Sequence, residues 1–436
     1  MEVNSEGAEP TPAASEAAIA SVLGNDDLLR EILARLGFPT RLVRAAAVSR
    51  RWLRDASDPA VLRRFRRLHP PRPLGFYVHA SPLLRFVPLP QGSESEPEHA
   101  AVVRRGSFGS RDDVVTDVWD CRNGRLLVTF LDPAMQRKLA VRSPLHPQRG
   151  TAELPRIPDA VYGDLDFRSV HSQFRLLPED GGDGMSSIEA IVMCNDRDRS
   201  VWVHLYHLQA GAWSECRTSN LIEIPEYIVC HKKSALLTYG KLYMICMGGH
   251  ILGLDLPSMN LLYIKLPDGV GYSSKLGLSR AEHSGFFLIH VKEFQIHVWL
   301  YSTVCSSSGN WKLVDTISLH QAFGHLVDPT WYSRGADVRL AAVGDNADFV
   351  FLRIQHEIFY VHICSRTVEK IYELTREHGP LFRVYPLMMP WPPTFPVLND
   401  RHDQMDEPTR VYVHNRTENF QLDQSFLLSA ANSELC

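Results

Sequence analysis

Two groups of histidines are the residues whose types and spacing first suggest chemistry. His204 and His207 lie in "VWVHLYHLQ", and His356, Glu357 and His362 lie in "QHEIFYVHI". Imidazoles and carboxylates at short spacing are common zinc ligands. Both segments have the apolar pattern of β-strands, and strand residues three apart point to opposite faces, so the first pair cannot share an ion. The second group lacks the helical H-E-x-x-H spacing. We therefore predict no metal and no cofactor.

Other catalytic signatures are also missing from the sequence. It contains no phosphate-binding G-x-x-x-x-G-K-[ST] loop and no G-x-S-x-G nucleophile elbow. We therefore predict that the chain is not an enzyme. Ser107 in "RRGSF" follows an arginine pair, so it is a candidate phosphorylation site that would gain about −2 in charge. The sequence leaves open whether this serine is modified.

The composition is that of an ordinary globular chain with room for two or three domains. It has 436 residues, of which 44% are hydrophobic and 22% are charged. The eight cysteines occur singly, with no C-x-x-C pair, as is typical of reduced thiols. The first residues are acidic and rich in Ala, Pro and Ser, and no apolar run reaches the roughly 18 residues of a membrane span. We expect residues 1–21 to be disordered and the protein to be cytoplasmic and/or nuclear, without membrane association.

A short helical module follows at residues 22–69. In "LGNDDLLREILARL", apolar residues recur at the three-to-four spacing of one helix face, Asn25 supplies an N-cap, and Gly37 with Pro39 ends the helix. Thr40, Ser49 and the run Ser57-Asp58-Pro59 predict the starts of three more helices.

Charge and size both indicate that this module binds a partner. Residues 23–69 contain eleven Arg against five Asp or Glu, whereas the whole chain has a net charge of −4. A module of roughly fifty residues cannot cover all of its apolar surface, so we expect an interaction module. Clustered arginines are also typical of nucleic-acid binding. However, no run of alternating basic and aromatic residues occurs and the remaining chain is acidic, so we predict that the protein does not bind nucleic acid.

From about residue 73 the pattern changes to short apolar runs separated by Gly, Pro, Asn, Asp and Ser, which predict β-strands. A strand, a turn and a strand with a large aromatic residue recur every 50 to 60 residues, with Trp213, Tyr263, Trp311 and Tyr372 at equivalent positions. We interpret these aromatics as packing between sheets. The spacing predicts an antiparallel β-propeller of about 6–7 blades over residues 73–399, followed by a polar tail at 400–436.

The helical segment "LGNDDLLREILARLGFPTRLVRAAAVSRRWLRDASDP" resembles an F-box. The whole chain is similar to plant F-box proteins with a C-terminal F-box-associated, kelch-like propeller, in which phrases like "VWDCRNGRLLV" and "LDLPSMNLLYIKLP" recur. Gly24 is a departure, because the family usually has Pro after the first Leu.

The resemblance implies a substrate-recognition adaptor of a Skp-cullin-F-box ubiquitin ligase. The helices would dock on the acidic Skp-type adaptor, which links them to a cullin scaffold, and the propeller would bind an unidentified protein substrate. The alternative is a propeller enzyme or small-ligand binder in which the helices are structural. Carried over position by position, the adaptor-binding candidates are Leu23, Leu28, Leu29, Ile32, Leu33, Leu36, Val43, Val48 and Trp52.

Overall fold

The structure is a computed structural model of the 436-residue chain. It forms two compact units, the first made of Met1–Pro71 with Pro390–Cys436 and the second of Arg72–Met389. The residues that the structure describes are 19–69, 73–80, 83–89, 97–106, 108, 114–155, 170–177, 186–195, 199–209, 211–214, 216–224, 230–271, 273, 275–281, 285–302, 310–323, 336–375 and 383–396. Three predictions lie outside the described residues. They concern the disordered start, of which only residues 19–21 are described, the candidate phosphorylation site Ser107 and the polar tail at 400–436.

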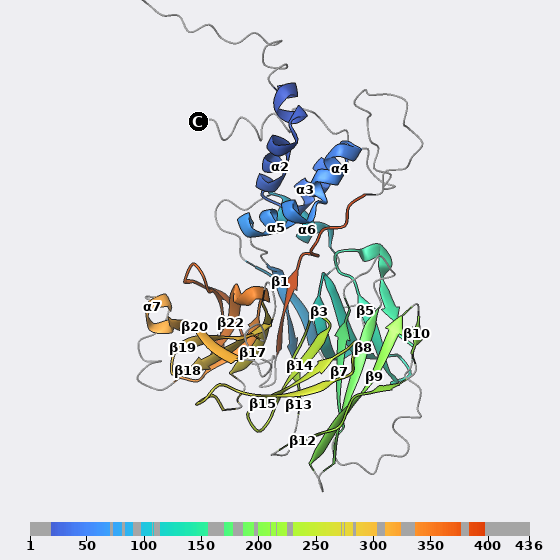
Figure 1. The fold of residues 1–436 in the computed structure, drawn as a ribbon, viewed down its shortest axis with the longest axis vertical. Helices are drawn as coiled ribbons and strands as arrows, with labels where there is room; N and C mark the ends of the chain where they lie inside the picture. Colours follow the sequence, from blue (N-terminus) through green and yellow to red (C-terminus); the bar gives the residue numbers. More distant parts are fainter. Residues whose placement is uncertain are drawn as a thin grey trace, which may run out of the picture. The chain divides into compact units, whose positions relative to one another are not determined.

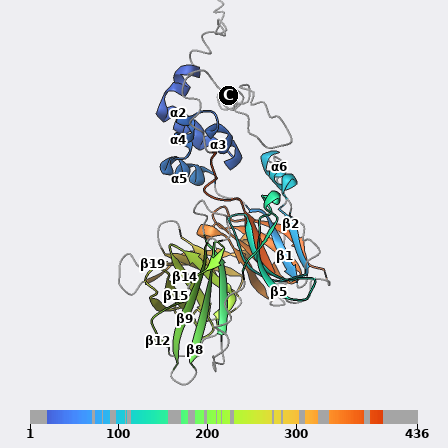
Figure 2. The same cartoon turned by 90° about the vertical axis from the view of Figure 1, so that its right-hand side faces the viewer.

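The first unit contains the predicted helical module (Figures 1 and 2). Residues 19–24 are helical, so the helical part begins before residue 22, the predicted start. The helices that follow pack against one another and are α2 (Asp26–Arg35), α3 (Pro39–Ala46), α4 (Arg50–Ala56) and α5 (Pro59–Leu68).

Three of the four predicted helix caps are confirmed. The side chain of Asn25 accepts hydrogen bonds from two backbone amides of α2, Ser49 accepts one from α4, and Asp58 accepts two from α5. The predicted cap at Thr40 is wrong, because α3 begins one residue earlier at Pro39 and has no side-chain cap. Proline is favoured at the first helical position, where its missing amide hydrogen has no partner to lose.

The second unit is the predicted antiparallel propeller, and its described strands form six blades (Figure 1). One sheet contains β2 (Leu83–Pro88), β1 (Pro73–Ala80) and β25 (Arg383–Met388). The next contains β3 (Val114–Arg122), β4 (Arg125–Leu131), β5 (Arg137–Arg142) and β6 (Thr151–Glu153). The third contains β7 (Val170–Leu176), β8 (Ser187–Asn195) and β9 (Ser200–Gln209), and the short strands β10 (Ala212–Trp213), β11 (Arg217–Thr218) and β12 (Ile222–Glu223) pair with β9.

The other three sheets each have four strands in chain order. The fourth sheet contains β13 (Cys230–Thr238), β14 (Lys241–Cys246), β15 (His250–Asp255) and β16 (Leu261–Lys265). The fifth contains β17 (Leu276–Arg280), β18 (Phe286–Lys292), β19 (Gln295–Ser302) and β20 (Asn310–Ser318). The sixth contains β21 (Val338–Val343), β22 (Phe349–Ile354), β23 (Glu357–His362) and β24 (Thr367–Glu373). Short helices are α6 (Pro97–Arg105), α7 (Leu319–Phe323), η1 (Pro147–Arg149) and η4 (Asp345–Ala347).

Strands from both ends of the propeller segment close the ring. The innermost strands β25, β3, β7, β13, β17 and β21 contact one another in a cycle, and β25 pairs with β1 in antiparallel register, with Val78 opposite Val384. This pairing leaves no open sheet at the join. The compact unit ends at Met389, before the predicted limit of residue 399. Three prolines, at 390, 392 and 393, follow this limit, and proline cannot donate to a strand ladder.

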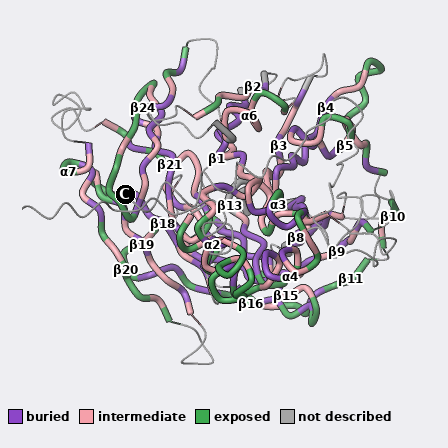
Figure 3. Tube along the Cα trace, turned by 90° about the horizontal axis from the view of Figure 1, so that it is seen from above, coloured by how far each residue is buried: buried purple, intermediate pink, exposed green. Residues whose placement is uncertain are grey.

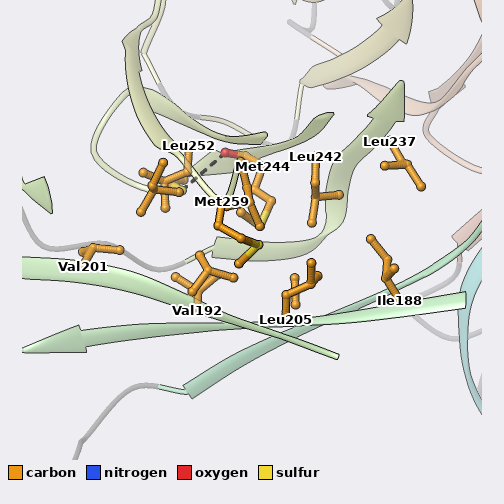
Figure 4. Packing of buried hydrophobic residues seen from close by; sticks show 14 of the residues in the cluster. Ile188, Val192, Val201, Leu205, Leu237, Leu242, Met244, Leu252 and Met259 are labelled. Atoms are coloured by element: carbon orange, nitrogen blue, oxygen red, sulfur yellow. Dashed lines mark hydrogen bonds between the residues drawn. The ribbon is translucent and has the colours of Figure 1, made fainter. Parts of the chain in front are cut away.

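Apolar faces of neighbouring blades form the propeller core. Side chains of β8 and β9, such as Val192 and Leu205, point toward Leu242, Met244 and Leu252 of the next blade (Figure 4). Figure 3 shows the corresponding gradient of burial, with exposed positions frequent on the outer strands β20 and β24. Apolar side chains in this interior each contribute about 1.5–3 kcal/mol relative to exposure.

The recurring aromatic residues lie on outer strands, in β10, β16, β20 and β24. Trp213, Trp311 and Tyr372 pack against a neighbouring sheet, whereas Tyr263 is exposed and contacts His250 of its own sheet. The indole of Trp311 donates to the carbonyl of Lys265 in the preceding blade at 2.8 Å, and that of Trp213 donates to the carbonyl of Pro155 at 3.0 Å. Each tryptophan therefore links its blade to the outer edge of the preceding one, which supports the packing interpretation.

Candidate functional site

The helical module is the candidate site, and burial divides its nine predicted adaptor-binding residues into three groups. Leu29 and Leu33 are 0% exposed and Trp52 is 7% exposed, so these side chains form the core of the module. Leu28 and Val48 are 45% and 39% exposed. The partly buried group comprises Leu23, Ile32, Leu36 and Val43.

The geometry of α2 explains why adjacent leucines differ so strongly. Successive helix residues are rotated by about 100°, so Leu29 and Leu33 share one face while Leu28 and Ile32 share another. The first face packs on a core completed by α3, α4 and α5, with Phe65 of α5 at 1% exposure. The second face keeps apolar area accessible, and it is this face that can bind a partner.

Arg51 of α4 holds the entry to α2. Its guanidinium donates to the backbone carbonyls of Leu23 and Gly24 at 2.8 and 2.9 Å, and to the Asp26 carboxylate at 2.8 Å. The hydrogen bond from Arg51 lowers the pKa of Asp26 below its ordinary value. A cation at the carbonyl end of the short 19–24 helix also suits the helix dipole. This arrangement fixes the entry although Gly24 replaces the usual proline.

A Cβ atom at Gly24 would meet nothing within 4 Å. The structure therefore leaves room for a larger residue at this position. The glycine is therefore not required by a close approach of the backbone.

Ion pairs occupy most of the acidic groups of the module. Glu31 binds Arg35 and Arg64, and the buried carboxylate of Asp55 accepts a hydrogen bond from Arg30 at 3.2 Å. The exposed side chains of Arg44, Arg63 and Arg67 form no ion pair within the described part of the chain. The surface consequently combines accessible apolar side chains with uncompensated positive charge, which favours an acidic partner.

Two residues that sequence reasoning missed also belong to this module. Trp391 stacks on Phe65 with ring centroids 5.6 Å apart and planes 16° apart, and Arg66 lies over the Trp391 ring at 5.9 Å. Phe395 packs on the same core. Their only sequence signal is the aromatic, proline-rich stretch "PWPPTFP", which lies within the predicted propeller segment 73–399.

The histidine groups have local partners in the structure. His204 receives a hydrogen bond from the indole of Trp202 at 3.1 Å and bonds the hydroxyl of Thr218 at 3.0 Å, and burial lowers its pKa. In the other group, Glu357 pairs with Lys370, and His362 lies at the far end of β23. Among the described residues no three His, Cys, Asp or Glu side chains form a metal cluster.

Among the described residues of the propeller, a shallow cavity of about 370 Å³ lies between the turn that joins β14 to β15 and the segment that follows β16. Four of its nine lining residues are glycines, and the charged side chains among them, Lys265 and Asp268, are exposed and pair with each other at 3.5 Å. No buried titratable group points into it. Within the described residues, no helix is long and apolar enough to cross a membrane.

The fold and this surface define a class of protein in which a small helical module precedes a six-bladed β-propeller. The family model described as "F-box protein AT5G49610-like, beta-propeller" matches residues 117–395, well over half of the chain. The chain belongs to this family of F-box proteins. The resemblance found in the sequence is thereby confirmed.

None of the curated proteins compared with the chain matches it. Similar solved structures include the extracellular domain of BT4673 from B. thetaiotaomicron (12% identity, 62% of this chain, 29% of that chain, TM-score 0.30) and Kluyveromyces lactis Hsv2 (12%, 59%, 63%, 0.31). Another is YCF48 from Cyanidioschyzon merolae (11%, 69%, 85%, 0.35). This chain spans less than two thirds of the first two, and their low similarity carries no functional argument.

Proposed function

We propose that this protein is a substrate-recognition adaptor of a Skp-cullin-F-box ubiquitin ligase. The helical module binds a Skp-type adaptor, the adaptor binds a cullin, and the propeller holds a protein substrate. The observation that carries this proposal is the apolar face of α2 at Leu28 and Ile32, which the core of the module leaves uncovered. Family membership supports it independently.

The physical basis is burial of this face by the partner. Apolar surface removed from water contributes about 25 cal/mol per Å². Exposed Arg44, Arg63 and Arg67 attract an acidic adaptor and increase the association rate. The buried candidates Leu29, Leu33 and Trp52 act by supporting this surface.

No bond chemistry is required of this chain. By holding a substrate near an activated ubiquitin, it raises the effective concentration of the reacting groups. Such a role needs a rigid scaffold with two separate binding surfaces, and it requires neither a catalytic residue nor a cofactor. Its location in the cytoplasm or nucleus stays a prediction.

Reconstitution from purified components tests the proposal. The chain, a Skp-type adaptor and the adaptor-binding part of a cullin are mixed in pairs and all together, and complexes are separated by size-exclusion chromatography. We expect the chain to elute with the cullin only when the adaptor is present. Failure of the folded chain to bind any Skp-type adaptor would overturn the proposed function.

A further inference from the structure

The helical module contains a segment from the far end of the chain. Residues 390–396, which we call the C-terminal strap, belong to the same compact unit as the helices. The half-buried ring of Trp391 is stacked on Phe65, and Phe395 packs on the same apolar cluster. The apolar surface around Phe65 is therefore covered by the C-terminal strap of the same chain.

The contact is specific in its chemistry. A tryptophan ring buries 150–250 Å² in favourable cases, and parallel aromatic rings at about 5–6 Å add attraction beyond that area. The guanidinium of Arg66 lies 5.9 Å from the centroid of the same ring, within the range of a cation–π interaction. By contrast, Pro392 and Thr394 of the strap are exposed.

The strap also follows directly from the strand that closes the propeller. The ladder between β1 and β25 ends with Pro73 opposite Met388, and only Met389 and Pro390 separate that pair from Trp391. Since β25 is also the innermost strand of its blade, it contacts β3 and β21 on either side. The strap therefore begins two residues after the strand pair that closes the ring.

The helical module is so small that the strap should contribute much of its stability. Four helices of seven to ten residues enclose little apolar volume by themselves, and most helical stability comes from packing. Two aromatic side chains are a large addition to such a core. The strap joins the core at Phe65, which is among the largest fully buried side chains of the protein.

We propose that the C-terminal strap is an integral part of the helical module, which reaches its docking-competent form only when β25 has closed the propeller. Adaptor binding would then report that the substrate-binding unit is complete. The part of the proposal that concerns docking rests on the proposed function. The part that concerns folding of the module does not.

The first test uses the full-length chain and amide hydrogen exchange read by mass spectrometry. In the double variant Trp391→Ala, Phe395→Ala, we expect exchange in α2 and α5 to accelerate at least about tenfold, while most of the propeller keeps its protection. Affinity for a Skp-type adaptor should fall by a similar factor. Thr394→Ala, in the same strap but exposed, is the matched control and should change neither quantity.

The second test perturbs the closing strand without touching the module. Leu387 of β25 is fully buried in the propeller, so Leu387→Ala should loosen β25. We expect exchange to accelerate in β25 and, with it, in α5. Faster exchange in β25 with unchanged α5 would overturn the coupling, and unchanged exchange of both helices in the strap variant would overturn the role of the strap.

The two proposals fail in different ways. If the wild-type chain binds no Skp-type adaptor, the proposed function is wrong, yet the exchange data still decide whether the strap completes the module. If the wild type binds and the strap variant binds equally well with unchanged exchange, the proposed function stands and the strap proposal is rejected.

Discussion

Replacing each of two adjacent leucines by alanine should destabilise the module to very different extents. Leu29 is fully buried, so Leu29→Ala removes core contacts and leaves a cavity, at a cost of about 2–5 kcal/mol. A unit of about fifty residues has a total stability of only about 2.5–7.5 kcal/mol by the usual value per residue. The variant therefore removes much of the stability of the module.

Leu28 is 45% exposed, so little more than half of the roughly 1.5–3 kcal/mol of a fully buried leucine is at stake, and the same change should cost about 0.8–1.7 kcal/mol. Hydrogen exchange over α2–α5 measures both effects, with the propeller amides as an internal reference. A loss of 2 kcal/mol corresponds to about thirtyfold faster exchange. Equal acceleration in both variants would refute the burial pattern on which the candidate surface depends.

Three further predictions concern a helix cap, a link between blades and a buried charge. Backbone hydrogen bonds lower the pKa of Asp58, so its contribution to stability is present above the unfolded value of about 3.9 and is lost as the pH falls through the lower folded value. Helical circular dichroism from pH 5 to 2 should show this loss. Asp58→Asn should make the dependence on pH shallower, and the part that Asp26 contributes should remain. Trp311→Phe keeps the ring but removes the hydrogen bond to Lys265, so calorimetry should show a loss of about 1 kcal/mol and a Tm lower by about 2 °C. Arg175 is buried and donates to carbonyls of both neighbouring inner strands, so Arg175→Met should cost about 3 kcal/mol or more in denaturant unfolding; a loss under 1 kcal/mol would contradict that role.

Local chemistry made the helix boundaries and the propeller predictable. The caps at Asn25, Ser49 and Asp58 involve neighbours two or three residues away, and the outer-strand aromatics repeat at the spacing of a blade. The start of α3 was mispredicted because Thr40 and Pro39 are both good residues for a first turn. The count of six blades follows only from the pairing of strands, since β1 and β25, from the two ends of the propeller segment, share one sheet.

The candidate surface was less predictable than the fold. Helical spacing places Leu28, Leu29, Ile32 and Leu33 on a single broad apolar side, and only packing by the other helices separates the buried pair from the accessible one. The strap was missed because the partner of Trp391 lies near the opposite end of the chain. Local patterns contain no information about such a contact.

The most direct test of the central claim is the dissociation constant between the full-length chain and a Skp-type adaptor, measured by calorimetry. The double variant Leu28→Asp, Val48→Asp places two charges on the accessible surface and leaves the core intact, while Leu221→Asp, 58% exposed on the propeller, is the matched control. We predict at least about hundredfold weaker binding for the double variant and no change for the control, because an unpaired charge in an apolar interface costs well over 1 kcal/mol. Equal affinity of the wild type and the double variant would contradict the account.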